Sequence, residues 1–324
     1  MTRLVAVTGA SGFIGRHLST QLAARGFEVR AIVRPSAVPL LRHTLHPEVV
    51  VVRAALDPTA LADAFRNVEA VIHLAGVIAA VRENDYWTVN VAGTRAVAEA
   101  ARRARARLVH VSSLAAAGPA APASPRSEDD APAPLTPYGR SKLESERAVA
   151  GFDGLNWIVL RPGVVYGPGD RAMLPLFRFA RRGFLPLVGR SSAAYTCIHV
   201  ADVVRAIEAA IDANVNREAI FVGHPVPVTA RELLEGVRAA AGRRAVIIRV
   251  PALVTRIGAA AGDLAGAVRG QPMLLTRSRY RELYADGFAC RVDRLREHLG
   301  VVAQIDLRDG LEETAAWYKR EGWL

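Results

Sequence analysis

Short apolar runs alternate with helical patterns of apolar and polar positions through the first half of the chain. Strand-length runs rich in Val and Ile lie at residues 4–8, 29–33, 49–54, 70–74, 108–112 and 157–161. Helical patterns lie between them, at residues 12–25, 60–65, 87–105 and 138–150. Apolar strands that alternate with helices are typical of a parallel sheet covered on both faces. Because such crossovers are right-handed, the pattern predicts an α/β fold with a doubly wound parallel sheet, the Rossmann arrangement.

The regular alternation ends after Gly167, and the later pattern is mainly helical, with expected helices at residues 175–182, 200–213, 230–241, 292–299 and 311–321. The predicted Rossmann domain comprises residues 1–167, with residues 196–222 returning to it. The predicted substrate-binding region is smaller and mostly helical, and comprises residues 168–195 and 223–324. Ligands bind at the carboxyl edge of such sheets, so we expect this region to cover that edge.

Two further stretches differ in composition from their surroundings. Residues 119–136 are rich in Pro, Ala, Ser and acidic residues, which predicts a mobile surface loop. Residues 251–270 are the most hydrophobic later stretch, but they contain Arg256, Asp263 and Arg269. These charges exclude a bilayer-spanning helix, so no transmembrane segment is predicted and an amphipathic helix at a pocket or on the surface is expected.

The net charge of +11 raises the question of a nucleic-acid partner. The only lysines are Lys142 and Lys319, so nearly all of the positive charge is arginine, spread over every segment. No nucleic-acid binding is predicted from so dispersed a charge. Cys197 and Cys290 lie far apart, so neither a disulfide framework nor a metal site is predicted, and a reducing, cytoplasmic compartment fits. The N-terminus leads directly into an apolar strand, so no leader peptide is expected.

Three glycines follow the first predicted strand, in the segment "TGASGFIG" at residues 8–15. Between a strand and a helix, Gly9 permits a tight turn, Gly12 lets the backbone approach a pyrophosphate, and Gly15 lets the helix pack on the strand. The N-terminus of that helix offers free N–H groups and a partial positive charge. This setting predicts a dinucleotide site, although the glycine spacing is G-x-x-G-x-x-G.

The end of the second predicted strand indicates which dinucleotide fits. A carboxylate there would bind a ribose 2′-hydroxyl, but the chain has Arg34. A guanidinium suits a 2′-phosphate, because it makes charge-assisted bonds to phosphate oxygens. NADP(H) is therefore favoured, with NAD(H) as the alternative, since arginine is abundant throughout the chain.

Tyr138 and Lys142 are four residues apart and fall on one face of a predicted helix, for which Thr136 is the expected N-cap. A phenol is a poor base at its ordinary pKa of about 10. A neighbouring ammonium and a nicotinamide cation both favour the phenolate, so this pair is typical of acid–base chemistry. Ser113, at the end of a predicted strand, can hold a substrate oxygen beside the tyrosine, although a structural role for this serine stays open.

As a set, the motifs resemble an extended short-chain dehydrogenase/reductase of the NAD-dependent epimerase/dehydratase family. The matching segments occur in the family's order over residues 1–207: "TGASGFIG", "VIHLAG" (71–76), "NVAGT" (90–94), "LVHVSS" (108–113), "YGRSK" (138–142), "RPGVVYGPGD" (161–170) and "IHVADVVRAI" (198–207). The ending "WYKREGWL" also resembles bacterial members.

The resemblance implies a role for each matching position. Tyr138 would be the general acid/base, Lys142 would bind the ribose and lower the tyrosine pKa, and Ser113 would orient the substrate oxygen. The pyrophosphate would be surrounded by Gly9, Gly12, Phe13, Ile14 and Gly15. The adenosine side would be lined by Leu74, Ala75 and Gly76, and the nicotinamide would be touched by Pro162, Val164 and Val165. Substrate-lining candidates are Tyr166, Met173 and Tyr195.

Several positions depart from the family pattern. Ala54 stands where many members have an adenine-binding Asp, so adenine recognition would rest on backbone contacts or on Asp57. Leu114 and Ala115 stand where sugar-nucleotide dehydratases carry an Asp-Glu pair. Tyr195 stands where sugar-nucleotide epimerases carry an arginine that grips a pyrophosphate. These departures favour a less charged substrate, although Arg171, Arg178 or Arg190 could still bind a phosphate.

The leading prediction is an NAD(P)-dependent oxidoreductase that moves hydride between the cofactor and a secondary alcohol or carbonyl of a small, weakly charged substrate. One alternative is a nucleotide-sugar epimerase that retains NAD. A second is a non-catalytic cofactor-binding sensor. By analogy with the family, a homodimer through the helices at residues 87–105 and 138–150 is expected.

Overall fold

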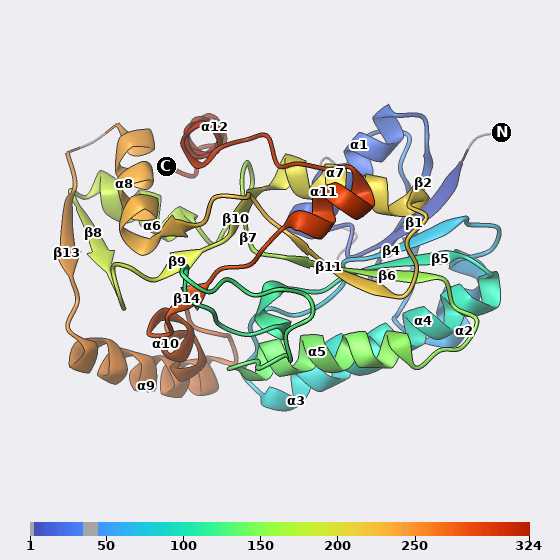
Figure 1. The fold of residues 1–324 in the computed structure, drawn as a ribbon, viewed down its shortest axis with the longest axis horizontal. Coiled ribbons are helices and arrows are strands. Elements are labelled where there is room, and N and C mark those ends of the chain that lie inside the picture. Colours follow the sequence, from blue (N-terminus) through green and yellow to red (C-terminus); the bar gives the residue numbers. More distant parts are fainter. Residues whose placement is uncertain (1–2, 35–44, 243) are drawn as a thin grey trace.

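The computed structural model describes residues 3–34, 45–242 and 244–324. Within these ranges, seven parallel strands form one sheet in the order β11-β6-β5-β4-β1-β2-β3. The strands are β1 (Leu4–Thr8), β2 (Glu28–Val33), β3 (Val50–Arg53), β4 (Ala70–His73), β5 (Arg107–Val111), β6 (Trp157–Pro162) and β11 (Glu218–Val222). The prediction of a doubly wound parallel sheet is confirmed (Figure 1).

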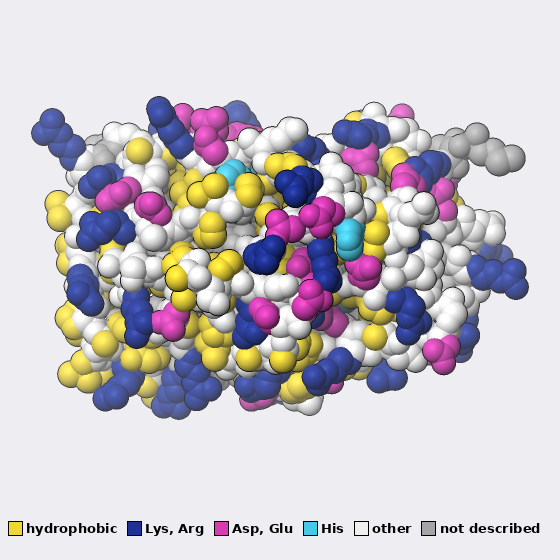
Figure 2. Space-filling model, in the orientation of Figure 1, with side chains coloured by type: hydrophobic (Ala, Val, Ile, Leu, Met, Phe, Trp, Pro, Cys, Tyr) yellow, Lys and Arg dark blue, Asp and Glu magenta, His cyan; other side chains and the backbone are white. Residues whose placement is uncertain are grey.

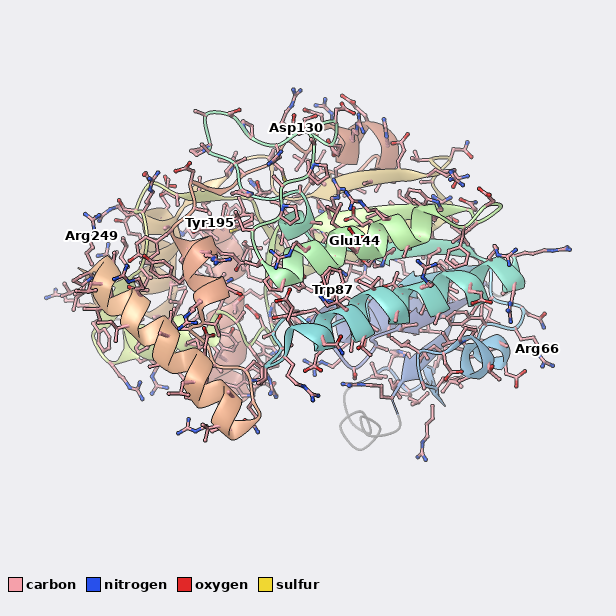
Figure 3. The ribbon with its side chains drawn as sticks, turned by 90° about the horizontal axis from the view of Figure 1, so that it is seen from below. Arg66, Trp87, Asp130, Glu144, Tyr195 and Arg249 are labelled. Atoms are coloured by element: carbon pink, nitrogen blue, oxygen red, sulfur yellow. The ribbon has the colours of Figure 1, made fainter. Side chains whose placement is uncertain are left out.

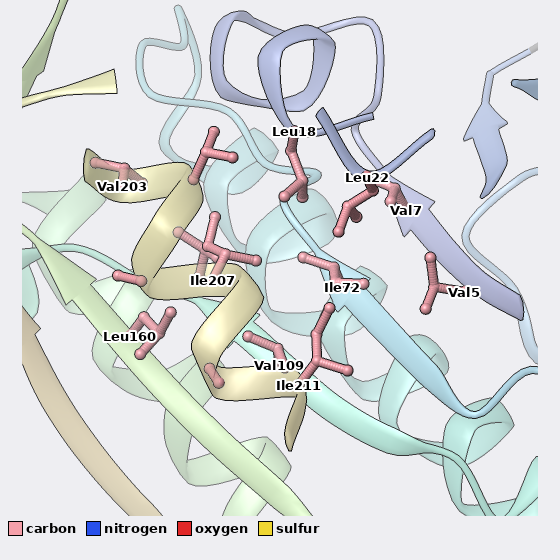
Figure 4. Packing of buried hydrophobic residues seen from close by; sticks show 14 of the residues in the cluster. Val5, Val7, Leu18, Leu22, Ile72, Val109, Leu160, Val203, Ile207 and Ile211 are labelled. Atoms are coloured by element: carbon pink, nitrogen blue, oxygen red, sulfur yellow. The ribbon is translucent and has the colours of Figure 1, made fainter. Parts of the chain in front are cut away.

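Helices cover both faces of this sheet. One face is covered by α1 (Phe13–Ala24), α7 (Val200–Asp212) and α11 (Asp293–Leu299), and the other by α2 (Pro58–Ala64), α4 (Gly93–Ala104) and α5 (Pro137–Ala150). In α7, Val203, Ile207 and Ile211 repeat every four residues and are buried. Figure 4 shows Ile207 and Ile211 close to the strand residue Ile72, with α1 beside α7. The helical spacing of apolar residues therefore decides which face of each helix meets the sheet.

The predicted helix at residues 87–105 is present, begins four residues earlier and contains a π-helical segment. The chain forms a short helix α3 (Glu83–Tyr86), then a π-helical turn η2 (Trp87–Ala92), and only then α4. Asn90 is buried in this turn, and its side chain exchanges hydrogen bonds with both backbone groups of Val77, at 2.8 and 3.0 Å. Its amide also donates to Ser141 Oγ at 2.9 Å. The π-helical turn therefore places Asn90 between the β4–α3 loop and α5. Such turns inside α-helices often occur at functional sites.

The later part of the chain forms a second core. It is built from α6 (Leu174–Arg181), α8 (Ala230–Ala241) and α12 (Leu307–Arg320), with the paired strands β8 (Phe184–Leu187) and β13 (Val246–Arg249). A three-stranded sheet joins β12 (Val228–Thr229), β9 (Ala194–Tyr195) and β14 (Gly287–Phe288). These strands are too short to give a periodic pattern, so the sequence predicted mainly helices here. Helix α11 instead packs on α7 and β11 of the large sheet.

The loop at residues 119–136 is held in place by backbone hydrogen bonds, contrary to the expectation of a mobile loop. Ala120 N donates to Gly287 O at 3.0 Å, and Arg126 N donates to Ala289 O at 2.9 Å. Glu128 accepts a hydrogen bond from Phe221 N on the edge strand β11. The composition is typical of an irregular segment, but its partners lie more than 80 residues away (221 − 128 = 93). Local sequence could not reveal them.

Candidate active site

The glycine loop has the close backbone contacts that a cofactor cradle needs. Gly9 has a φ of +73°, and a Cβ added there would lie 2.6 Å from Ala75 N. A Cβ on Gly15 would lie 2.3 Å from Gly9 O, so only glycine lets α1 pack this closely on the loop. Gly12 is the N-cap of α1 and provides no side-chain hydrogen bond to it. The first N–H groups of α1 are therefore free to bind an anion, and this loop fits a dinucleotide pyrophosphate.

The positions expected around the cofactor line the carboxyl edge of the sheet. Phe13 and Ile14 begin α1 and are half-buried, and Leu74 and Ala75 directly follow β4. Gly76 is exposed, and a Cβ there would lie 3.0 Å from Asn90 Oδ1. At the far side, Pro162 ends β6, and Val164 and Val165 begin β7 (Val164–Tyr166), which pairs with β10 (Cys197–His199). These positions follow the carboxyl ends of β1, β4 and β6, three strands of the large sheet.

Helix α5 presents Tyr138 in its first turn. Thr136 is the N-cap and accepts a hydrogen bond from Gly139 N at 3.2 Å, and Pro137 fills the first helical position. A Cβ on Gly139 would lie only 2.5 Å from Ala115 O. This contact brings α5 against the short helix at Leu114–Ala116, whose N-cap is Ser113. Gly139, which the sequence reasoning did not single out, therefore allows Ser113 and Tyr138 to approach each other.

The ionisation of Tyr138 depends on burial and on Ser113. Burial raises the pKa of the Tyr138 phenol to about 12, whereas a hydrogen bond with the Ser113 side chain lowers it. The negative charge of Glu282 raises it further. The phenol of Tyr138 is therefore protonated at neutral pH. It can donate a proton, and the Ser113 hydroxyl lies beside it.

Lys142 lies one turn after Tyr138 and is buried. Its Nζ donates a hydrogen bond to Val111 O at 2.8 Å, at the end of β5. Burial lowers the pKa of Lys142 to about 8, and the nearby Glu146 carboxylate opposes that shift. The ammonium therefore stays charged at neutral pH and faces the end of the strand that leads to Ser113.

Behind Lys142 lies a buried polar layer that the sequence reasoning missed. Arg161 and Glu146 form a buried ion pair at 2.6 Å, and Ser112 donates to the same carboxylate. The stacked rings of His73 and His110 are 5.2 Å apart. Burial and the charge of Lys142 lower the pKa of His73 to about 3 and hold the pKa of His110 well below its ordinary value. The two imidazoles are therefore neutral, and Lys142 is the cation that faces the site.

The three substrate-lining candidates lie in different surroundings. Tyr166 is buried, its hydroxyl donates to Asp306 O at 3.0 Å, and its ring meets His199 edge-on. Met173 is buried in the same core beside α6. These placements favour packing roles for both. Tyr195 on β9, labelled in Figure 3, is half-buried. Burial raises the pKa of its phenol, the charge of Arg279 lowers that pKa and the charge of Glu282 raises it.

Helix α10 (Arg277–Leu283) adds charge that the sequence reasoning did not find. Glu282 accepts a hydrogen bond from Thr136 Oγ1 at 3.2 Å, two residues before Tyr138. Arg279 forms an ion pair with Glu282 at 3.1 Å. The ring of Tyr86 lies 6.3 Å from that of Tyr138. Because α10 is more than 130 residues from Tyr138 in sequence (282 − 138 = 144), only the fold brings these groups together.

At the adenosine end, Arg34 and Arg53 follow or end the neighbouring strands β2 and β3, and Asp57 is the nearby carboxylate. Arg34 is exposed directly after β2, and Arg53, in register with Val33, ends the neighbouring strand β3. Ala54 is buried, and its N–H donates to Val33 O. Because its side chain is a methyl group, it offers no polar atom to an adenine. Asp57 is the N-cap of α2 and accepts from Ala60 N at 2.9 Å.

Comparison with known proteins decides the family. The model of the NAD dependent epimerase/dehydratase family matches residues 5–223. The chain belongs to this family. It is an enzyme of a group of NAD(P)-dependent reductases, dehydrogenases and epimerases, with the extended short-chain dehydrogenase/reductase fold.

Three known proteins are similar to this chain over nearly their whole length. Ceramide reductase of Caulobacter vibrioides is 33% identical, covering 99% of this chain and 96% of that protein. The 2-alkyl-3-oxoalkanoate reductase of Stenotrophomonas maltophilia is 30% identical, covering 96% and 98%. The solved structure of MoeE5 with UDP-glucuronic acid and NAD is 27% identical, with a TM-score of 0.75, covering 98% and 99%.

Among the described residues there is no group of three or more His, Cys, Asp or Glu side chains suited to a metal ion. In the same part of the chain, no helix is long and apolar enough to cross a membrane. The described Cys197 and Cys290 are both free and buried.

Proposed function

We propose that this family member is a ketoreductase, which uses NADPH to reduce the carbonyl of an uncharged, largely apolar substrate to a secondary alcohol. One combined observation carries this proposal. Tyr138 is protonated, and Leu114, Ala115 and Tyr195 are uncharged at positions where sugar-nucleotide enzymes carry charged side chains. The bound cofactor would supply hydride to the carbonyl carbon. The glycine loop, Leu74 to Gly76, and Pro162 to Val165 would hold it at the carboxyl edge of the sheet.

The chain's own residues would handle the proton. Tyr138, with a pKa of about 12, is protonated at neutral pH and would donate its proton to the carbonyl oxygen as charge develops there. The Ser113 hydroxyl would donate a hydrogen bond to the same oxygen and fix its position. The Lys142 ammonium would stabilise the phenolate that remains, because an opposite charge nearby favours the ionised form.

The immediate surroundings of the site favour a substrate without phosphates. Leu114 and Ala116 are buried, and neither Leu114 nor Ala115 can act as an acid or base for removing water. The three arginines considered as phosphate ligands have contacts of their own. Arg190 pairs with Asp286, Arg178 donates to Trp323 O, and Arg171 lies over the Trp323 ring at 5.2 Å.

The two reductase relatives support the same choice. They share more sequence with this chain than the MoeE5 structure does, and their names refer to a ceramide and to an alkyl oxoalkanoate. Both names refer to molecules with apolar hydrocarbon chains. The second candidate, a nucleotide-sugar epimerase that retains NAD, is favoured by the likeness to MoeE5 with UDP-glucuronic acid and NAD.

Turnover of purified enzyme would separate these candidates. We expect NADPH oxidation, followed at 340 nm, with long-chain and sterol ketones, and no interconversion of UDP-glucose and UDP-galactose. Tightly bound NAD in the purified protein, together with epimerisation of a UDP-sugar and no net use of NADPH, would contradict the proposal. Binding of NADPH without turnover of any ketone would favour the sensor alternative.

Arg34 provides a separate test of the cofactor preference. Replacing Arg34 with Ala should raise KM for NADPH about tenfold or more, because a charge-assisted bond to the 2′-phosphate is worth roughly 1.5–3 kcal/mol. KM for NADH should change less than twofold, which serves as the internal control. Equal effects on both cofactors would show that Arg34 does not bind a 2′-phosphate.

The same proposal includes a homodimer in the cytoplasm, with α4 and α5 of two copies in contact. The exposed faces of these helices carry the ion pairs Glu99–Arg103 and Glu144–Arg147, so such an interface would be polar at its rim. Sedimentation equilibrium at micromolar protein would show a monomer if the proposed dimer is wrong.

A further inference from the structure

Helix α9 (Ala252–Arg269) has two opposite apolar faces, and only one of them is packed. The packed face consists of small residues, with Thr255, Ala259 and Gly266 buried. A Cβ on Gly262 would lie 1.9 Å from Leu275 O, which shows how closely this face meets the following segment. The Tyr284 hydroxyl donates to Thr255 Oγ1 at 3.3 Å and ties α10 to the same face.

The opposite face of α9 exposes large aliphatic side chains to solvent. We call this set the α9 stripe. It consists of Leu253, Val254, Ile257, Leu264 and Val268, which are 57% to 80% exposed. Four of them recur at helical spacing, three, four or seven residues apart, so they share one side of the helix. Leu274 extends the apolar surface beyond the C-terminal end of the helix. On the other side, β13 leads into α9 and has two exposed apolar side chains, Val246 and Ile248. A contiguous exposed apolar surface is typical of an interaction site.

Positive charge accompanies this surface. Residues 244–282 contain seven arginines and two acidic residues. Asp263 pairs with Arg277, and Glu282 pairs with Arg279. Among the residues that the structure describes, the other five arginines form no ion pair: Arg244, Arg249, Arg256, Arg269 and Arg281. In Figure 2, dark blue and yellow side chains gather at the lower left, where Figure 1 shows β13 and α9.

From this combination we propose that the α9 stripe docks on the surface of an anionic phospholipid bilayer. The aliphatic side chains would enter the boundary between headgroups and acyl chains, while the arginines around them would bind lipid phosphates. A helix that lies in the interface needs an apolar face and a basic polar rim, and α9 has both. The excess of arginine also argues against a second copy of this chain on the same face, because two such surfaces would bring like charges together.

The docked orientation would place a lipid near the catalytic tyrosine. Beside the stripe lies a shallow groove lined by Arg256, Ile257, Ala260, Arg277, Tyr280 and Arg281. Tyr280 and Arg281 also line a second groove, which reaches Leu135 in the loop before Tyr138. The two grooves therefore adjoin and lead from α9 toward the site. This route rests on the proposed function, whereas the docking itself does not.

Figure 3, which looks from below, shows α9 in front on this side, with Arg249 beside its first turn. The stripe residues are exposed, and α9 lies away from the large sheet (Figure 1). Substitutions in the stripe should leave the fold intact, since the packed face of α9 is the opposite one.

Vesicle sedimentation of the full chain tests the docking without any substrate. We expect the protein to sediment with vesicles of phosphatidylcholine containing about one-third phosphatidylglycerol, and to stay in the supernatant with phosphatidylcholine alone. The double substitution Ile257→Glu/Leu264→Glu should weaken binding at least tenfold. Val302→Glu, at an exposed apolar position on another surface, is the matched control and should bind as the unchanged protein does.

A second variant separates charge from insertion. Arg256→Gln/Arg269→Gln should weaken binding several-fold and reduce its dependence on salt. The docking proposal is overturned if the unchanged protein does not sediment with anionic vesicles, or if Ile257→Glu/Leu264→Glu binds them normally. It is also overturned in favour of self-association if that double substitution changes the oligomeric state while vesicle binding is absent. Melting temperature and NADPH binding, measured on each variant, show that it is folded; these readouts keep a failed docking distinct from a failed ketoreductase assignment.

Discussion

The half of the chain that forms the large sheet and the segment around α9 both use glycine for close packing. They differ in whether the rest of the chain covers their outer surface. At Gly9, Gly15 and Gly139, a Cβ would meet backbone atoms within 2.3 to 2.6 Å, and the neighbouring layers are covered by other parts of the chain. At Gly262 the contact is just as close, yet the outer face of α9 carries exposed aliphatic residues. The first region is completed by its own chain, whereas the second has a surface that suits an external partner.

This contrast predicts large functional effects from small changes in the first region. The largest is expected for Tyr138→Phe, which removes the proton donor and leaves the ring in place. Ketone reduction should fall by roughly 10²–10⁴-fold in kcat. NADPH affinity, measured by fluorescence titration, should change little. Retention of more than a tenth of the turnover would contradict the assignment of Tyr138 as the acid.

Gly139→Ala tests whether backbone contact sets the geometry of the site. The new methyl group would lie 2.5 Å from Ala115 O, so α5 must move away from the short helix that carries Ser113. Overpacking of this kind costs about 1–3 kcal/mol in stability. Turnover should fall about tenfold or more, because a small misplacement of reacting groups is costly.

Gly151→Ala is the matched control at the other end of α5. There a Cβ would lie 3.5 Å from Arg147 O, an ordinary van der Waals contact. Its melting temperature and turnover should match those of the unchanged enzyme. If both substitutions behave alike, the close approach at Gly139 does not determine the site.

The lowered pKa of Lys142 predicts a pH effect of intermediate size. Between pH 8 and the ordinary pKa of 10.5, the unfolded chain holds a proton at this residue that the folded chain has released. This group therefore destabilises the fold below pH 8, and its contribution to stability rises as the pH rises through that window. Ketone reduction should decline as the pH rises through about 8, because the ammonium is lost.

Lys142→Met separates these two consequences. At pH 7 its melting temperature should exceed that of the unchanged protein by ~1–3 °C, with the difference shrinking toward pH 10, while turnover is largely lost. Lys319→Met, at an exposed position, is the control and should change neither property. If Lys142→Met instead has a lower melting temperature at pH 7, the hydrogen bonds and charge interactions of the Lys142 ammonium stabilise the fold by more than its burial destabilises it.

The smallest effect is expected in the second region. Tyr284→Phe removes the hydrogen bond to Thr255 that joins α10 to α9, which is worth about 0.5–1.5 kcal/mol. KM for the ketone should rise less than threefold, and KM for NADPH should not change. A loss as large as that of Gly139→Ala would show that the two regions are equally sensitive.

The sequence by itself determined the parallel sheet, the glycine loop and the Tyr138–Lys142 pair. These features depend on near neighbours: apolar spacing fixes the strands and helices, and a four-residue interval fixes a shared helix face. Ser113 could be placed as well, because it directly follows a buried strand.

Only the tertiary structure decided which distant groups surround that pair. Glu282 and Arg279 come from α10, Arg161 and Glu146 pair behind Lys142, and the loop at residues 119–136 is held by residues 287–291. It also decided that Tyr166 is buried and that the α9 stripe is exposed. An apolar residue has the same local pattern whether it is covered or not, because covering depends on chain segments far away in sequence.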